Sequence, residues 1–192
     1  MTRNKPRFRG LFITGTDTGI GKTRIALGLM ESLKKKGIKV CAMKPVATGC
    51  YAEKDGLRNE DALLLQSHAC RAVDYSLLNP YAFAPPIAPH IAAQQAGQEI
   101  CLASIKRCYD ALQAQSGFVV VEGIGGWEVP LNSKEGVSDL ARILGLPVLL
   151  VVGLRLGCLN HALLTSAAIQ ASGCELIGWI GNRIDPDFSH AH

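Results

Sequence analysis

The stretch from residue 11 to residue 23, LFITGTDTGIGKT, constrains this chain more than any other. A short apolar run leads into a glycine-rich turn, which ends in Gly21-Lys22-Thr23 just before an amphipathic helical pattern. A strand, a glycine-rich loop and a helix in this order let backbone N–H groups and the helix N-terminus converge on a polyphosphate. Lys22 would reach the outer phosphates, and the Thr23 hydroxyl would bind Mg²⁺.

The turn departs from the usual G-x-x-x-x-G-K-[ST] spacing in one place. Thr16 stands where the first glycine is expected, and Gly15 comes one residue earlier. The strand before the turn and the helix after it favour a phosphate-binding loop. A plain glycine-rich turn that happens to contain a lysine and a threonine stays open as an alternative.

Composition limits the class of protein. A chain of 192 residues, 48% of them hydrophobic, predicts a single domain spanning residues 1–192. Its seven cysteines are scattered and form no C-x-x-C pair, which favours a reducing cytoplasm over a disulfide framework or a zinc site. The net charge of +4 is not gathered with aromatic residues as in nucleic-acid-binding proteins, and no segment is long and apolar enough for a membrane span. We expect a cytoplasmic protein that binds neither nucleic acid nor membrane.

Apolar periodicity along the chain alternates between the spacing of strands and that of helices. The predicted strands span residues 8–14, 38–43, 118–121, 147–152 and 175–180, and the predicted helices span residues 22–36, 62–69, 89–96, 99–115, 137–144 and 159–171. Gly37 is expected to end the first helix and Asn59 to cap the second. A polar loop is expected over residues 47–58 and a long irregular crossover over residues 71–90.

Strands such as residues 118–121 are apolar at every position, which is typical of strands buried on both faces of a parallel sheet. The alternation predicts an α/β fold of P-loop NTPase type, a doubly wound and mainly parallel sheet with helices on both faces. Ligands bind such sheets at the carboxyl ends of the strands. The loops at that edge, which we expect to form one site, are residues 15–23, 44–50, 122–127, 153–160 and 181–185.

Glu122 is the second strong signal. A carboxylate directly after a buried strand is costly unless it faces a cation. Mg²⁺ on the nucleotide phosphates would be that cation, because Thr23 with one or two carboxylates suits its octahedral preference. Asp61 is a further candidate ligand; an acidic residue that only interacts with the dipole of a helix start is the alternative.

Lys44 follows a predicted strand at the same edge, and Pro45 fixes the turn behind it. Lys44 would supply a second cation that neutralises charge developing during phosphoryl transfer, although a solvated lysine is the plainer interpretation. Thr18 and Thr48 offer hydroxyl groups nearby. The helix start at residues 157–160 could bind a substrate carboxylate, and Asn182 could bind the edge of an adenine base.

Several motifs together resemble the dethiobiotin synthetase family, and they keep the family's order along nearly the whole chain. The matching stretches are TGTDTGIGKT (14–23), MKPVATG (43–49), LRNEDALLLQ (57–66), NPYAF (79–83), PHIAAQQ (89–95), VVVEGIGGWEVPL (120–131), LPVLLVVGLRLGCLNHALLT (146–165) and GWIGN (178–182). A shared phosphate-binding loop would be weak evidence by itself, whereas this set is highly specific.

The resemblance implies a homodimeric P-loop enzyme that uses ATP, Mg²⁺, CO₂ and 7,8-diaminopelargonate. One amine would be carboxylated to a carbamate, ATP would phosphorylate the carbamate, and the neighbouring amine would close the ureido ring with loss of phosphate. In such a mechanism the protein contributes positioning and electrostatic stabilisation rather than a nucleophile.

The resemblance also implies a role for each matching residue. Lys22 and Lys44 would be catalytic, and Thr23, Asp61 and Glu122 would hold Mg²⁺. The nucleotide would bind Gly19, Ile20, Gly21, Lys22, Thr23, Arg24, Asp61, Glu122, Gly123, Ile124, Gly125, Asn182 and Arg183. The diamine or carbamate would contact Thr18 and Thr48, and the substrate carboxylate would meet Gly157, Cys158, Leu159 and Asn160 near the dimer interface.

Two departures from the family pattern are visible. Position 48 is Thr where the family often has Ser, which keeps the hydroxyl group. The chain ends at His192, short of the family's usual length, so a last strand and loop contacts to the nucleotide would be lacking.

A regulatory class of protein and another enzyme class compete with this interpretation. Dimeric ATPase switches of the partitioning or division-site type share the fold but place a lysine five residues before the P-loop lysine, where this chain has Asp17. An ATP-dependent amidoligase would need a glutaminase domain, for which this chain has no room.

Overall fold

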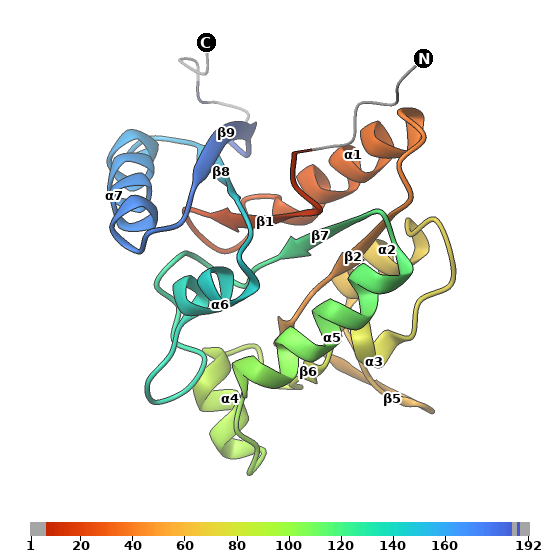
Figure 1. Ribbon diagram of the computed structural model, residues 1–192. Coiled ribbons are helices and arrows are strands. Elements are labelled where there is room, and N and C mark those ends of the chain that lie inside the picture. Colours follow the sequence, from red (N-terminus) through yellow and green to blue (C-terminus); the bar gives the residue numbers. More distant parts are fainter. Residues whose placement is uncertain (1–6, 186–187, 189–192) are drawn as a thin grey trace.

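The computed structural model describes residues 7–185 and 188, which are built around a five-stranded parallel sheet in the order β2-β7-β1-β8-β9 (Figure 1). Its strands are β1 (Gly10–Gly15), β2 (Val40–Met43), β7 (Phe118–Glu122), β8 (Val148–Leu154) and β9 (Leu176–Arg183). β1 lies in the centre and pairs with β7 on one side and β8 on the other. The predicted doubly wound parallel sheet is confirmed.

Helices cover both faces of the sheet, as predicted. They are α1 (Lys22–Lys35), α2 (Glu60–Ser67), α3 (Tyr75–Leu78), α4 (Pro89–Gln95), α5 (Leu102–Gln115), α6 (Val137–Leu144) and α7 (Cys158–Ala171). Alternate residues of β1 face opposite ways because side chains alternate along a strand. Ile13 packs with Met30 of α1, whereas Phe12 lies in the larger core cluster with Tyr109 of α5 and Leu144 of α6.

Short strands beside the sheet were not predicted. β3 (Val46–Ala47) pairs with β6 (Tyr81–Ala82), and β4 (Tyr51–Glu53) pairs with β5 (Gly56–Arg58) as an antiparallel hairpin. The prediction of a plain loop over residues 47–58 is therefore wrong. Lys54 and Asp55 form the turn of this hairpin, and Gly56, which pairs with Glu53, has a φ of 109° that favours glycine. The irregular crossover over residues 71–90 likewise contains α3 and β6.

Most element boundaries differ from the sequence prediction by one or two residues, and the start of α5 and the end of β9 differ by three. The helix predicted to begin at residue 99 begins at Leu102, after an extended Cys101 whose amide donates to the Tyr81 hydroxyl at 3.1 Å. β9 continues to Arg183, with Asn182 paired to Gly153, so the predicted loop at residues 181–185 is wrong over its first three positions. The predicted helix stop is confirmed, since Gly37 has a φ of 75° and its amide donates to Lys34.

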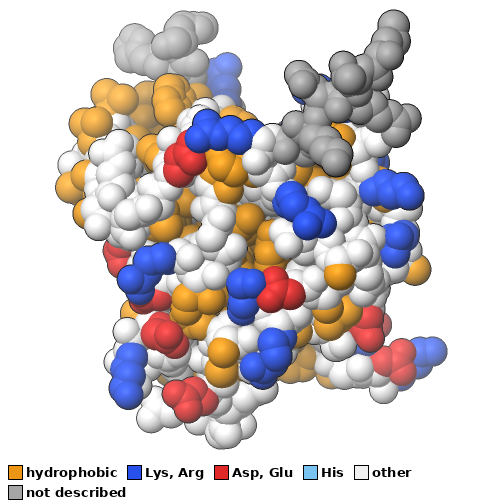
Figure 2. Space-filling model, in the orientation of Figure 1, with side chains coloured by type: hydrophobic (Ala, Val, Ile, Leu, Met, Phe, Trp, Pro, Cys, Tyr) orange, Lys and Arg blue, Asp and Glu red, His pale blue; other side chains and the backbone are white. Residues whose placement is uncertain are grey.

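α7 and the loop just before it expose a group of leucine side chains. Leu156, Leu159, Leu163 and Leu164 are 91%, 77%, 73% and 63% exposed, and Trp179 of the neighbouring β9 is 66% exposed. Figure 2 shows hydrophobic side chains gathered at the upper left, where Figure 1 has α7 and β9. Among residues 7–185 and 188, no helix is long and apolar enough to cross a membrane.

Candidate active site

A cavity of about 300 Å³ opens at the carboxyl ends of β1, β2 and β7, which is the edge that the sequence predicts for the ligand. It brings together residues from the loops after all three strands. The cavity is lined by Thr18, Gly19, Gly21, Lys22, Thr23, Lys44, Ala47, Thr48, Asn59, Asp61, Glu122, Ile124 and Gly125. Residues more than a hundred positions apart in the chain therefore meet at one concave site of the size that small ligands occupy.

The glycine-rich turn has the backbone of a phosphate-binding loop. Gly19 and Gly21 have φ values of 72° and 88°, which side-chain-bearing residues rarely adopt, and α1 begins directly after Gly21. Gly15 replaces the displaced first glycine, because a Cβ at that position would lie 2.5 Å from the Ile20 side chain and 3.1 Å from the side chain of Lys22. The departure at Thr16 therefore leaves the turn intact.

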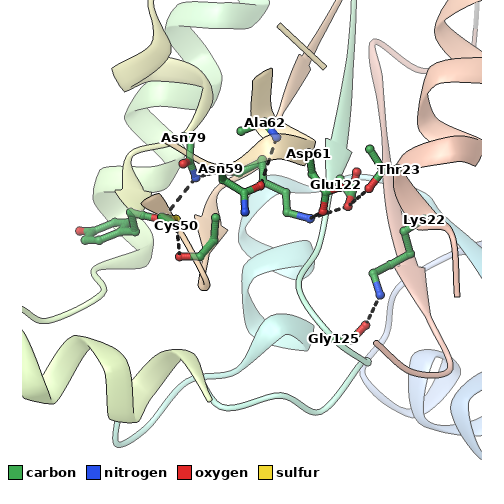
Figure 3. A network of polar contacts seen from close by, with 12 residues as sticks. Lys22, Thr23, Cys50, Asn59, Asp61, Ala62, Asn79, Glu122 and Gly125 are labelled. Carbon is green, nitrogen blue, oxygen red and sulfur yellow. Dashed lines mark hydrogen bonds and ion pairs between the residues drawn. The ribbon is translucent and has the colours of Figure 1, made fainter. Parts of the chain in front are cut away.

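Lys22 bridges the turn to the loop after β7. Its ammonium donates to the backbone carbonyls of Asp17 and Gly125, each at 2.7 Å, and Figure 3 shows the side chain pointing at Gly125. Burial and the nearby Lys44 lower the pKa of Lys22 to about 8, although three carboxylates partly offset this. The ammonium is thus held at the cavity wall by two neutral carbonyl groups, which suits a group that receives phosphate oxygens.

Lys44 and two carboxylates form the second half of the site. The Lys44 ammonium lies 2.5 Å from Glu122 Oε1 and 3.2 Å from Asp61 Oδ2. The Thr23 hydroxyl donates to the same Glu122 oxygen at 3.0 Å. Figure 3 shows Thr23, Asp61 and Glu122 directed toward one another. Burial by itself would lower the pKa of Lys44, but the carboxylates of Glu122 and Asp61 raise it above its ordinary value, so the ammonium is charged.

These oxygens also fit a divalent cation. Glu122 is 1% exposed, and its Oε2 atom is buried without a hydrogen-bond partner among the described residues. A buried carboxylate oxygen without a donor is costly unless a cation completes its environment. With the Thr23 hydroxyl and the half-exposed Asp61 beside it, the donor set is all oxygen, which is the chemistry that Mg²⁺ prefers.

The crossover over residues 71–90 holds Lys44 in place. Buried Asn79 donates from Nδ2 to the Lys44 carbonyl at 2.7 Å, and the Lys44 amide donates to Leu78 at 2.8 Å. The Tyr75 hydroxyl donates to Asn79 Oδ1 at 3.0 Å and accepts from the Asn59 amide at 2.9 Å. Asn79 thus positions the backbone of Lys44. No role for it was predicted from the sequence, and the NPYAF motif was the only sign of its importance.

Replacing Asn79 by alanine should lower both stability and turnover. The change leaves the buried Lys44 carbonyl unpaired, which costs about 1–3 kcal/mol of unfolding free energy. An activity that depends on the Lys44 ammonium should fall by roughly tenfold or more, since small misplacements at a reacting centre are costly. Asn132→Ala is the matched control, because Asn132 donates to the Ile100 carbonyl at 2.9 Å away from the cavity. Urea unfolding and steady-state kinetics of both variants check this; an equal loss of kcat in both would contradict it.

Some predicted site residues lie outside the cavity wall. Ile20 is buried beneath the turn, Arg24 is exposed on α1, and a Cβ at Gly123 would contact the Phe12 ring at 3.1 Å. Asn182 donates to the Ile20 carbonyl at 2.7 Å and so braces the turn. The remaining predicted residues that do not line the cavity are Gly157, Cys158, Leu159 and Asn160, at the start of α7, and Arg183, at the end of β9.

Two contacts, one at the cavity wall and one beside the glycine-rich turn, were not foreseen from the sequence. Asn59, predicted as a helix cap, does cap α2 through the Ala62 amide at 3.2 Å, but it also lines the cavity with Ala47. Arg155, after β8, donates to the Asp17 carboxylate at 2.6 Å. Because Arg155 comes from a loop far from the turn in the chain, no local pattern in the sequence predicts this contact.

Comparison with known proteins decides the family. A family model described as an AAA domain matches residues 9–191. The ATP-dependent dethiobiotin synthetase BioD of Pseudomonas aeruginosa (strain LESB58) is 52% identical over 176 residues, which cover 91% of this chain and 77% of that protein. The chain belongs to the ATP-dependent dethiobiotin synthetases.

Further comparisons agree with the assignment and with the fold. The ATP-dependent dethiobiotin synthetase BioD of Xanthomonas campestris pv. campestris (strain B100) is 49% identical over 180 residues, covering 94% of this chain and 80% of that protein. The MinC:MinD cell division protein complex of Aquifex aeolicus matches with a TM-score of 0.56 at 16% identity, covering 93% of this chain and 70% of the matched chain. The second likeness concerns the P-loop NTPase fold alone.

Proposed function

We propose that this chain closes the ureido ring of dethiobiotin from 7,8-diaminopelargonate, CO₂ and ATP, and is thus a ligase of biotin biosynthesis. The observation that carries the proposal is a buried Lys44–Glu122 ion pair facing the phosphate-binding lysine, Lys22, across one cavity. This arrangement suits the transfer of a phosphoryl group between two anions. About half of the aligned residues are identical to those of proteins named ATP-dependent dethiobiotin synthetase, which supports the choice of reaction.

The proposed reaction has three steps. One amine of the substrate adds to CO₂ and loses a proton, which gives a carbamate. A carbamate oxygen attacks the γ-phosphorus of ATP, the bond from that phosphorus to its bridging oxygen breaks, and ADP leaves with the electron pair. The second amine attacks the carbamate carbon and loses a proton, the carbon–oxygen bond to phosphate breaks, and phosphate leaves as the ring closes.

The residues of the cavity would serve these steps by charge and position. Backbone N–H groups of residues 19–23 would surround the phosphates at the start of α1. Lys22 would move from its two carbonyl partners onto the outer phosphate oxygens, and Lys44 would neutralise the carbamate and the transferring phosphoryl group. Thr18 and Thr48 would offer hydroxyl groups to the diamine or carbamate.

Thr23, Asp61 and Glu122 would hold Mg²⁺, whose charge stabilises the phosphates when it is bound. The unpartnered Oε2 atom of Glu122 supports this assignment.

A second copy of this chain is proposed to cover α7, with the substrate carboxylate binding near that interface at residues 157–160. The support is the group of exposed leucine side chains on α7 and the loop before it, which continues onto Trp179. Exposed apolar patches of this kind on soluble proteins usually mark an interaction surface. The scattered cysteines favour a cytoplasmic enzyme, and the family match over residues 9–191 supports one catalytic domain.

The homodimer predicts that Leu163→Glu gives a monomer. Leu163 is 73% exposed, so a glutamate is accommodated in an isolated chain but would be desolvated at an interface. Sedimentation velocity should detect a dimer for the parent protein and a monomer for the variant. Leu64→Glu is the matched control, because Leu64 is 47% exposed on α2, away from this group. A parent protein that sediments as a monomer at all concentrations would contradict the dimer.

The function is tested by incubating the protein with 7,8-diaminopelargonate, bicarbonate, Mg²⁺ and ATP and measuring the ureido product by mass spectrometry. We expect product together with ADP formation that depends on the diamine, and loss of both in Lys22→Met. ATP hydrolysis that proceeds equally without the diamine, with no ureido product, would instead indicate an ATPase switch.

A further inference from the structure

An ion pair joins the phosphate-binding turn to the loop after β8. Arg155 Nη2 donates to Asp17 Oδ2 at 2.6 Å, and the two residues are 138 positions apart in the chain. Both side chains are roughly half exposed, at 43% for Arg155 and 46% for Asp17. An ordinary surface pair of this kind contributes little to stability, so its meaning depends on what Asp17 does in the turn.

Asp17 shapes the turn with both its side chain and its backbone. Its Oδ1 atom accepts from the Thr18 amide at 2.7 Å, and its carbonyl accepts from the Lys22 ammonium at 2.7 Å. Thr18, Gly19 and Lys22 all line the cavity. The acidic side chain therefore holds the first half of the turn in shape, but it also brings a negative charge to the place where phosphates would bind.

That charge opposes binding of a polyphosphate unless it is balanced. Asp17 lies close enough to Lys22 to act on its pKa, so its field reaches the group that would receive the outer phosphates. Phosphate-binding helix starts attract anions through N–H groups and the helix dipole, and a nearby carboxylate works against both. A guanidinium fixed on the carboxylate removes most of this repulsion while leaving Oδ1 bound to Thr18.

We propose that Arg155 is a positioning residue for the nucleotide, which acts by neutralising Asp17 so that this aspartate shapes the turn without repelling the phosphates. The inference rests on the proposed function only in that the cavity receives a nucleoside triphosphate. It adds the loop after β8 to the nucleotide site, although Arg155 does not line the cavity. The effect is electrostatic, so it grows with the charge of the bound phosphates.

The test is a set of variants: Arg155→Met, Asp17→Asn and the double variant. Isothermal titration calorimetry measures the affinity for ATP, ADP and adenosine in the absence of the diamine. Asp17→Asn keeps the side-chain oxygen that accepts from Thr18 and loses only the charge. Arg142→Met is the matched control, because Arg142 makes a similar 2.6 Å ion pair with Asp139 on the surface of α6.

We expect Arg155→Met to weaken ATP binding roughly tenfold, ADP binding less and adenosine binding not at all, with a smaller effect at high salt. The double variant should regain most of the lost affinity, because no carboxylate is left to balance. A double variant as weak as Arg155→Met, or an equal loss for all three ligands, would overturn the proposal. Both readouts concern binding alone, so a failed ring-closure assay would not affect them.

Discussion

Lys44→Met is expected to lower kcat for ring closure by roughly 10²–10³-fold, since it removes a preorganised charge from the reacting centre. It should also destabilise the protein. Glu122 is 1% exposed, and without Lys44 its carboxylate stays buried with the Thr23 hydroxyl as a donor. Breaking a buried pair by removing one partner costs about 3–5 kcal/mol of unfolding free energy.

A double variant separates the two effects. Lys44→Met combined with Glu122→Gln removes the stranded charge, so urea unfolding should recover most of the lost stability while kcat stays at least as low as in Lys44→Met. Lys39→Met is a suitable control, because Lys39 lies at the opposite end of β2, outside the cavity. Single-variant activity within about threefold of the parent would contradict a catalytic Lys44.

Glu122→Gln is expected to remove the dependence of nucleotide binding on Mg²⁺ and to lower kcat by roughly 10²–10³-fold. An amide in place of the carboxylate takes one negative charge from the oxygen set of Thr23 and Asp61, which then binds the cation weakly. In the parent protein, Mg²⁺–ATP at 100 times its Kd should raise the free energy of unfolding by about 2.7 kcal/mol relative to the ligand-free protein. In the variant, Mg²⁺ should add nothing beyond the effect of ATP alone.

Thermal unfolding with ATP, with and without Mg²⁺, measures this difference. Glu128→Gln is the matched control, because exposed Glu128 lies on the loop that follows the same strand and accepts from the Ser138 hydroxyl at 3.2 Å, away from the cavity. An Mg²⁺ response in Glu122→Gln equal to that of the parent would show that the cation binds elsewhere.

Much of the fold follows from local patterns in the sequence. Residues 118–121 are apolar throughout and lie buried in the sheet, and Gly37 ends α1 in the left-handed region as expected. Such features can be predicted from a few consecutive residues. An apolar run indicates a strand buried on both faces, and a glycine indicates a backbone conformation that other residues rarely adopt. The carboxyl edge of the sheet could therefore be identified as the ligand edge before any contact was known.

Contacts between distant segments could not be predicted in the same way. Asn79 reaches the Lys44 carbonyl, and Arg155 reaches Asp17, only because the folded crossover and the loop after β8 come back to the cavity. The contact of Asn182 with an adenine base stays a prediction, whereas its hydrogen bond to the Ile20 carbonyl could not be predicted from local pattern. These contacts join residues that are far apart in the chain, so the periodicity of the sequence does not predict them.

The proposed phosphorylation of a carbamate can be tested directly with oxygen-18. When the carbamate is made from labelled CO₂, the oxygen that attacks the γ-phosphorus stays on the phosphate after the carbon–oxygen bond breaks. ³¹P NMR of phosphate released in short reactions should therefore detect one labelled oxygen for each product molecule formed. Ureido product accompanied by unlabelled phosphate would contradict phosphoryl transfer to the carbamate in this cavity.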